Sequence, residues 1–238
     1  DGLIVIVDSR VADVRMRIIN SDGSEAEMCG NGIRCFAKYV YDSGIIEKKQ
    51  FTVETPAGIM EPEITVGADN KAELITINMG RPSFNRSEIP MEGTDGRVLN
   101  EDLGVDGENW KITSLLMGVP HTVTYVDDVD SVDIEKIGPL FEKHEAFPKH
   151  TNINFAQQMD DRTVKVRTWE RGAGATLACG TGSCSVAVAS FLNGRTGREV
   201  DIQLPLGTLH IEYREEDGNV YMTGPAAVSF TGTWPDET

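Results

Sequence analysis

The stretch EMCGNGIRC occupies residues 27–35, and a related stretch, LACGTGSC, occupies residues 177–184. Each contains a cysteine followed by Gly-X-Gly, and the two cysteines, Cys29 and Cys179, are 150 residues apart (179 − 29). The segments VRMR and VKVR precede these cysteines at the same distance. A duplicated unit with one cysteine per copy predicts two thiols that face one site across a pseudo-two-fold axis. Such thiols could act as acid and base on the two faces of one carbon.

The duplication also bears on the fold. A chain of 238 residues suits one large domain or two of roughly 120 residues, and the repeat favours two. Short β-branched runs separated by Gly, Pro, Asn and Asp predict strands through most of the chain. Helices are expected over residues 32–42 and 182–193, each directly after a Cys-Gly-X-Gly motif and before a glycine suited to a C-cap. Apolar residues on most sides of both helices predict that they are buried.

We therefore expect an α/β (α+β) fold with two pseudo-symmetric halves. Each half is a strongly curved, mostly antiparallel sheet wrapped round a buried central helix, with the active site in the cleft between the halves. The first half is expected to comprise residues 1–80 plus 225–238, and the second residues 81–224. The polar stretch 85–107 is expected to be loop or linker, and a further amphipathic helix is expected over residues 133–144.

Composition limits the class of protein. The formal net charge of −16 repels phosphate backbones, so a nucleic-acid partner is not expected. The apolar runs are too short to span a bilayer, and no secretory signal is recognisable, which predicts a cytoplasmic protein without a membrane partner.

The chain begins at Asp1 without an initiator Met and enters an apolar run at once, from which we expect a missing upstream segment. A homodimer remains open.

The position of each motif cysteine before a helix predicts reactivity. Free N–H groups and the positive end of the helix dipole favour a thiolate, and the glycine N–H groups could hold a carboxylate. Cys35 and Cys184 fall inside the apolar helices and are expected to pack in the core. The spacings within the two cysteine pairs do not both fit C-x2–4-C, so no zinc or other metal site is expected.

Longer motifs carry a resemblance. The segments NSDGS (20–24) before MCGNGIRC, WERGAG (169–174) before ACGTG, MGVPH (117–121) and TNINF (151–155) resemble the diaminopimelate epimerase family, in order along essentially the whole chain. The resemblance implies an isomerase that needs no pyridoxal phosphate or other cofactor. Its substrate is a small amino acid, LL-diaminopimelate, one α-carbon of which is inverted to the meso form for lysine and peptidoglycan precursor biosynthesis.

The resemblance also implies roles for particular residues. Cys29 and Cys179 become the catalytic acid/base pair. The substrate-binding residues form two groups. The reacting carboxylate is held by Gly30, Asn31, Gly180 and Thr181. The far, non-reacting amino-acid end is bound by Asn20, Asn152, Glu170 and Arg171. An Arg suits a carboxylate as a bidentate partner, and a Glu suits an ammonium group. His121 is either a supporting residue near the site or a simply hydrogen-bonded core histidine.

The sequence departs from the family pattern at two places. Val119 stands where many members have a substrate-contacting Asn, and the family's N-terminal Gly-Asn-Asp-Phe stretch is absent. Alternatives to the family's activity are a racemase of another amino acid, such as histidine, and a catalytically silent ligand-binding protein. For Glu170 and Arg171 a solvated charge pair, and for Asn20 a plain turn residue, remain open.

Overall fold

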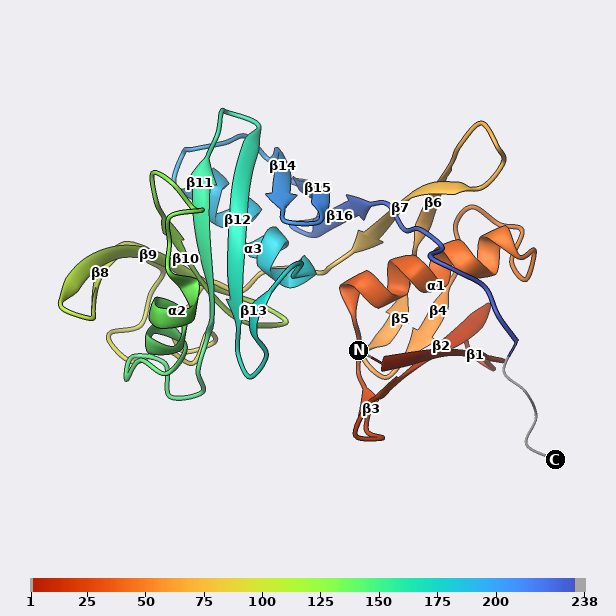
Figure 1. Ribbon diagram of the computed structural model, residues 1–238, viewed down its shortest axis with the longest axis horizontal. Helices are drawn as coiled ribbons and strands as arrows, with labels where there is room; N and C mark the ends of the chain where they lie inside the picture. Colours follow the sequence, from red (N-terminus) through yellow and green to blue (C-terminus); the bar gives the residue numbers. More distant parts are fainter. Residues whose placement is uncertain (1, 234–238) are drawn as a thin grey trace. The chain divides into compact units, whose positions relative to one another are not determined.

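The structure, a computed structural model, describes residues 2–233 and divides into two compact units (Figure 1). Unit 1 comprises residues 1–75 with 225–238, and unit 2 comprises residues 76–224. Sheets dominate both units and helices are few, which confirms the mixed α+β class expected from the sequence.

Unit 1 is a small sheet with one helix. Its strands follow the order β1-β2-β4-β5, in which β1 and β2 are antiparallel, β2 and β4 are parallel, and β3 pairs with β2. The elements are β1 (Gly2–Val7), β2 (Val14–Asn20), β3 (Glu25–Ala26), α1 (Gly30–Asp42), β4 (Val53–Thr55), β5 (Gly58–Met60), β6 (Glu63–Val66) and β7 (Ala72–Asn78), the last of which continues into unit 2.

Unit 2 is built on a larger, mostly antiparallel sheet. Its strands run in the order β16-β15-β14-β12-β11-β10-β9-β8, and β16 also pairs with β7, which pairs with β6. From β16 to β8 the parallel pairs are β10–β11 and β12–β14. The elements are β8 (Val98–Val105), β9 (Glu108–Met117), β10 (Val119–Tyr125), α2 (Ile134–Glu142), β11 (Asn152–Gln158), β12 (Thr163–Glu170), β13 (Gly174–Thr176), α3 (Gly180–Leu192), β14 (Glu199–Leu204), β15 (Gly207–Tyr213) and β16 (Val220–Gly224).

The repeat in the sequence is a repeat in strand pairing. In unit 1, β2 pairs antiparallel with β3 and parallel with β4, which forms a hairpin with β5. In unit 2, β12 makes the same pairings with β13 and β14, and β14 forms a hairpin with β15. The registers agree as well, because Ile18 faces Ala26 in one unit and Thr168 faces Thr176 in the other. The duplication inferred from the cysteine motifs therefore extends over the surrounding strands.

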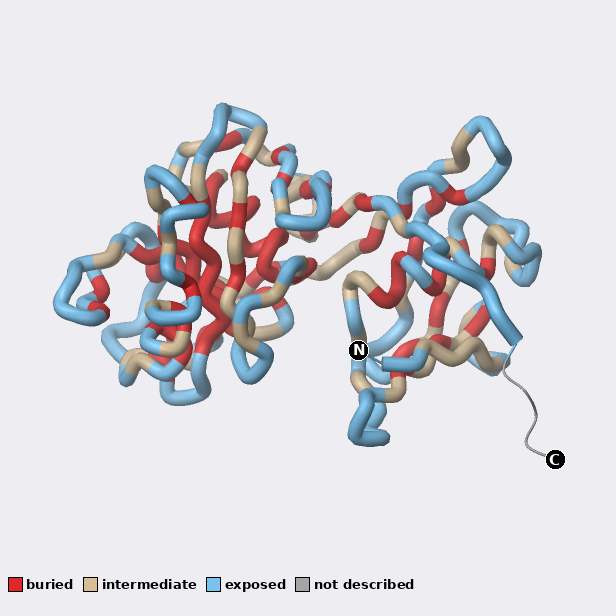
Figure 2. Tube along the Cα trace, in the orientation of Figure 1, coloured by how far each residue is buried: buried red, intermediate tan, exposed pale blue. Residues whose placement is uncertain are grey.

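The two central helices differ in burial. Most of α3 is buried, as the sequence predicted, and it packs on the face of the sheet that carries Val123, Val164 and Val166 (Figure 2). One side of α1 is exposed, including Cys35 and Tyr39, so the expectation of an all-round buried helix is wrong for α1.

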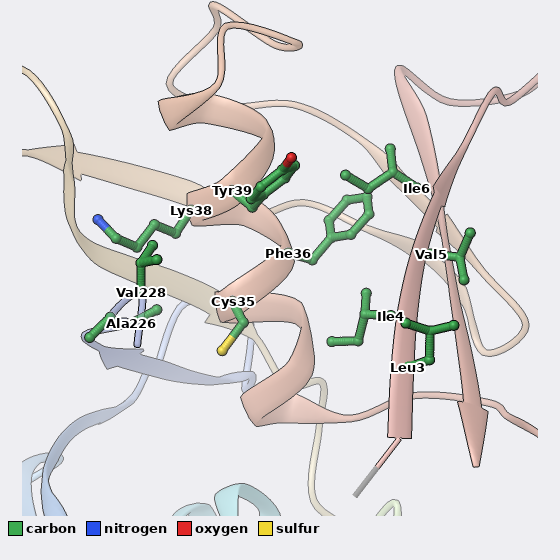
Figure 3. A pocket seen from close by; sticks show the side chains of 11 residues that line it. Leu3, Ile4, Val5, Ile6, Cys35, Phe36, Lys38, Tyr39, Ala226 and Val228 are labelled. Atoms are coloured by element: carbon green, nitrogen blue, oxygen red, sulfur yellow. The ribbon is translucent and has the colours of Figure 1, made fainter. Parts of the chain in front are cut away.

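Cys35 is therefore not a core residue, whereas Cys184 is, with no exposed surface. Cys35 lies on the wall of an apolar hollow of about 570 Å³ in unit 1, formed by β1, α1 and residues 226–228 (Figure 3).

The expected linker at residues 85–107 contains a strand instead. Its second part forms β8, which pairs antiparallel with β9 and buries Val98, Leu103 and Val105. The polar run Asn100-Glu101-Asp102 interrupts the apolar residues of β8, and for this reason composition alone did not predict the strand. The three buried residues join Phe141 of α2 in a core cluster on the face of the sheet opposite to α3.

Side-chain alternation places polar residues on the α3 face of three neighbouring strands. Because successive side chains of a strand point to opposite faces, Ile153 and Phe155 of β11 pack with the α2 cluster, while Asn154 lies on the other face. His121 of β10 and Thr168 of β12 share this face with Asn154 and are buried.

Candidate active site

Each motif cysteine is the N-cap of a helix. Cys29 caps α1 and its sulfur accepts a hydrogen bond from the Gly32 N–H at 3.3 Å; Cys179 caps α3 and its sulfur accepts from the Gly182 N–H at 3.4 Å. A side chain at Gly182 would not fit, because a Cβ there would lie 2.6 Å from Asn154 Oδ1 and 3.2 Å from Cys179 Sγ. The second glycine of the motif thus allows the helix start to approach the thiol closely.

The electrostatics at Cys179 differ from the sequence prediction. Cys179 is 5% exposed, and the pKa of its thiol is raised from 9.0 to about 12, first by burial and then by the charge of Glu170. Hydrogen bonds from Thr181 and the Gly182 N–H act in the opposite direction but are outweighed. The expected lowering of the thiol pKa by the helix start is therefore wrong for Cys179, which is a thiol at neutral pH. Cys29, by contrast, is exposed.

His121 is fully buried beside this thiol. Burial, followed by the charge of Arg171, lowers the pKa of its imidazole to about 3, so the ring is neutral at neutral pH. Its Nε2 lies 3.0 Å from Thr181 Oγ1, and the Thr181 hydroxyl lies 3.6 Å from Cys179 Sγ. A line of three polar groups therefore runs from β10 to the sulfur.

The side-chain amides of Asn154 and Asn152 lie beside the two ring nitrogens of His121. The Asn154 amide donates from Nδ2 to Thr122 O at 3.1 Å, and its Oδ1 accepts from the Thr168 hydroxyl at 3.0 Å, which fixes the orientation of the amide. The same Nδ2 lies 3.3 Å from His121 Nδ1. The Nδ2 of Asn152, which donates to Pro120 O at 3.2 Å, lies 3.4 Å from His121 Nε2. Each ring nitrogen thus has a side-chain amide beside it, and Nε2 has Thr181 Oγ1 as a further partner.

Glu170 is the last residue of β12, and Arg171 follows it in the turn to β13. The Arg171 N–H donates to Asn152 Oδ1 at 2.7 Å, and its guanidinium donates to Lys149 O at 2.8 Å. Glu170 accepts a hydrogen bond from Thr176 at 2.5 Å and is close enough to Cys179 to raise the pKa of the thiol. Asn152, Glu170, Arg171, Thr181 and Cys179 are thus gathered on unit 2, together with His121.

Gly180 begins α3 in unit 2, and the remaining predicted residues lie on unit 1. Gly30 begins α1, and the side chain of Asn31 accepts from the Arg34 guanidinium at 3.0 Å. Asn20 ends β2 and bonds with Ser24 through both its backbone N–H and its side-chain amide, which are the contacts of a turn residue. In the repeat, Asn20 occupies the position of Glu170 (20 + 150), so the two strand ends carry corresponding polar side chains.

Three residues close to this cluster were not recognised from the sequence. Asn154 and Thr168 complete the surroundings of His121, and Glu142 binds the turn that carries Arg171. Asn154 could have been noticed, because a polar side chain in the otherwise apolar run INFA departs from a simple core strand. Glu142 gives no such signal.

Among residues 2–233, no three His, Cys, Asp or Glu side chains are arranged to hold a metal ion. In the same part of the chain, none of the helices has the length and apolar character needed to cross a membrane.

Solved structures identify the class of fold. The chain is similar to a hydroxyproline epimerase from Agrobacterium vitis, with 16% identity, a TM-score of 0.66, and coverage of 94% of this chain and 71% of the other. It is also similar to a phenazine biosynthesis protein of the PhzF family from Bacillus anthracis, with 18% identity, a TM-score of 0.64, and coverage of 94% and 81%. The fold is thus one that these epimerase and phenazine-biosynthesis proteins share.

Sequence comparisons narrow the class to one family. The family model described as diaminopimelate epimerase matches residues 1–85 and 113–229. Proteins named diaminopimelate epimerase are 50% identical over 238 residues in Pelotomaculum thermopropionicum and 49% identical over 232 residues in Methanococcus maripaludis strain C5. These matches cover 100% and 98% of this chain and 84% and 83% of the relatives. The chain belongs to the diaminopimelate epimerase family, and it is an isomerase.

Proposed function

We propose that this protein is a cytoplasmic enzyme of lysine and peptidoglycan precursor biosynthesis that inverts one α-carbon of LL-diaminopimelate to the meso form, without a cofactor. Cys29 and Cys179 exchange the α-proton. The observation that carries this proposal is the pair of cysteines at equivalent helix starts, each within hydrogen-bond distance of a backbone N–H three residues further on. Membership of the diaminopimelate epimerase family supports the substrate.

The chemistry needs one thiolate and one thiol. The thiolate takes the α-proton, the C–H bond breaks, and its electron pair is delocalised into the substrate carboxylate. The thiol then gives its proton to the opposite face of the carbon, so that one sulfur gains a proton and the other loses one. The raised pKa of the buried Cys179 thiol favours its role as the acid that protonates the substrate, and we propose Cys29, which is exposed, as the base.

The surroundings of Cys179 support this role as acid. After it has given up its proton, the sulfur is an anion in a buried position, which is costly without hydrogen-bond donors. The Gly182 N–H at 3.4 Å and the Thr181 hydroxyl at 3.6 Å are such donors.

Helix starts also suit the reacting carboxylate. The first N–H groups of α1 and α3 lie at the positive ends of the helix dipoles. A carboxylate held by such groups is polarised, and this polarisation acidifies the neighbouring α-proton. Gly30 with Asn31, and Gly180 with Thr181, would provide these contacts.

The far end of the substrate is assigned to the turn after β12. Arg171 is an exposed cation whose backbone N–H is fixed by Asn152, and a guanidinium binds a carboxylate in bidentate fashion. Glu170 offers a negative charge to the ammonium group. A substrate with an amino-acid group at both ends would satisfy both charges, whereas an amino acid with one carboxylate would not.

Replacement of the two cysteines tests the proposal. Cys29→Ala and Cys179→Ala should each abolish the conversion of LL- to meso-diaminopimelate, because neither thiol can reach both faces of the carbon. Cys35→Ala, which removes an exposed thiol of α1, is the matched control and should keep parental turnover. Conversion that survives the loss of Cys179 would rule out the assigned acid.

A further inference from the structure

Glu142 is a buried carboxylate that the proposed chemistry does not use. It is the last residue of α2 and is 7% exposed. A negative charge at the C-terminal end of a helix faces the negative end of the helix dipole, and burying a carboxylate is costly in itself. Glu142 is therefore poorly placed to stabilise α2, and its contacts must be sought outside the helix.

Both carboxylate oxygens bind the segment that carries Arg171. Oε2 accepts from Trp169 Nε1 at 2.7 Å, and Oε1 accepts from the Gly172 N–H at 3.2 Å. His150 Nδ1 is a further neighbour at 3.7 Å. Trp169 and Gly172 lie on either side of the Glu170-Arg171 pair, so one side chain holds this pair from both ends.

The packing around α2 reinforces this arrangement. A Cβ at Gly138 would lie 2.6 Å from Cγ and Cδ2 of Trp169, so the glycine lets the indole lie directly against the helix. Gly172 has a φ of +78°, a backbone conformation that L residues rarely adopt. This conformation lets its N–H donate to Glu142 Oε1. The turn is held in one conformation by α2.

We propose that Glu142 is a positioning residue for substrate specificity: through Trp169 and Gly172 it fixes the turn so that Arg171 meets the distal carboxylate of the substrate. This inference rests on the proposed function of Arg171. A guanidinium displaced by even one ångström loses much of its bidentate interaction. Glu170 has a contact of its own, the hydrogen bond from Thr176, which does not depend on Glu142. Glu142 should thus affect the binding of diaminopimelate far more than the proton transfer at Cys179.

Glu142→Gln is the most conservative test. The glutamine keeps the size of the side chain but has one acceptor oxygen, so its NH2 group must face either the indole N–H or the Gly172 N–H. We expect KM for diaminopimelate to rise about tenfold, with kcat within about twofold of the parent. Glu145→Gln, an exposed neighbour three residues further on, is the matched control and should change neither constant.

Arg171→Ala separates this inference from the proposed function. If Glu142 acts through Arg171, Glu142→Gln should have no further effect on KM in an Arg171→Ala background. A KM effect that persists in full in that background, or an equal loss in kcat, overturns the positioning role. If Arg171→Ala itself leaves KM unchanged, the proposed contact of Arg171 has failed, and the inference built on it falls with it.

Trp169→Phe keeps the inference testable if Glu142→Gln fails to fold. It removes only the indole N–H and leaves Glu142 bound to Gly172. We expect a smaller rise in KM, of about threefold, again with kcat retained. An unchanged KM in this variant, with a melting temperature equal to that of the parent, overturns the inference.

Discussion

The charge of Glu170 beside the buried Cys179 thiol leads to a quantitative prediction. The rise in the pKa of this thiol from 9.0 to about 12 corresponds to about 4 kcal/mol against the thiolate. At pH 8 an ordinary thiol is about 10% ionised, whereas Cys179 is about 0.01% ionised. Glu170→Gln removes the second-largest cause of the shift and keeps the burial, so the thiolate fraction should increase at least about tenfold.

Alkylation with iodoacetamide measures this fraction, because the thiolate is the reacting form. Peptide mapping by mass spectrometry follows Cys179 and the exposed Cys35 in the same sample. In the parent, the rate at Cys179 should rise about tenfold per pH unit from pH 7 to pH 10 without a plateau, since the pH stays below the thiol pKa. Glu170→Gln should accelerate Cys179 and leave Cys35 unchanged. A plateau near pH 9 in the parent, or equal rates in the two proteins, would refute the reasoning.

Three further predictions concern stability and the close packing at the site. Because the His121 pKa is lowered from 6.5 to about 3, the unfolded chain binds one more proton than the folded chain between these pH values, and up to about 5 kcal/mol of unfolding free energy is lost as the pH falls through them. His121→Asn should make the unfolding free energy, measured by urea titration, depend less on pH in this range. An unaltered pH dependence would contradict the buried neutral ring. Gly182→Ala should lower kcat at least about tenfold, because its Cβ would meet Asn154 Oδ1 at 2.6 Å; steady-state kinetics with parental kcat would disprove this crowding. In denaturant unfolding, Cys184→Ala should destabilise the protein by about 1 kcal/mol or more, whereas Cys35→Ala should destabilise it by less than about 0.5 kcal/mol. The reverse order would contradict the burial of Cys184 and the exposure of Cys35.

Local signals in the sequence were sufficient for the helix starts and the hairpins. The Cys-Gly-X-Gly motif predicted helix starts at residues 32 and 182, and the helices begin two residues earlier, at Gly30 and Gly180. The glycines after α1 and α3 have φ values of +74° and +66°, as a C-cap requires. The triplets Pro56-Ala57-Gly58 and Pro205-Leu206-Gly207, whose Pro and Gly are typical turn residues, lie at the turns between β4 and β5 and between β14 and β15. Each of these features depends on a few neighbouring residues, which is why the sequence alone predicts them.

Properties that depend on distant neighbours were missed. The pKa of Cys179 is decided by burial and by Glu170, nine residues away in sequence (179 − 170), and these outweigh the helix start. Asn154 reaches His121 only because β10 and β11 are parallel neighbours, a pairing that no short motif encodes. Glu142 binds a turn roughly 30 residues away through the packing of α2 on β12.

The exchange of protons between two different sulfurs is the central claim, and isotope incorporation tests it most directly. LL-Diaminopimelate is incubated in D2O with the protein and no added cofactor, and the reaction is stopped at low conversion. If Cys29 removes the proton and Cys179 delivers one, the meso product carries deuterium at the inverted α-carbon while the remaining LL substrate stays unlabelled. Deuterium in the recovered substrate at the same level as in the product, or a product that retains its original α-hydrogen, would contradict the two-cysteine account.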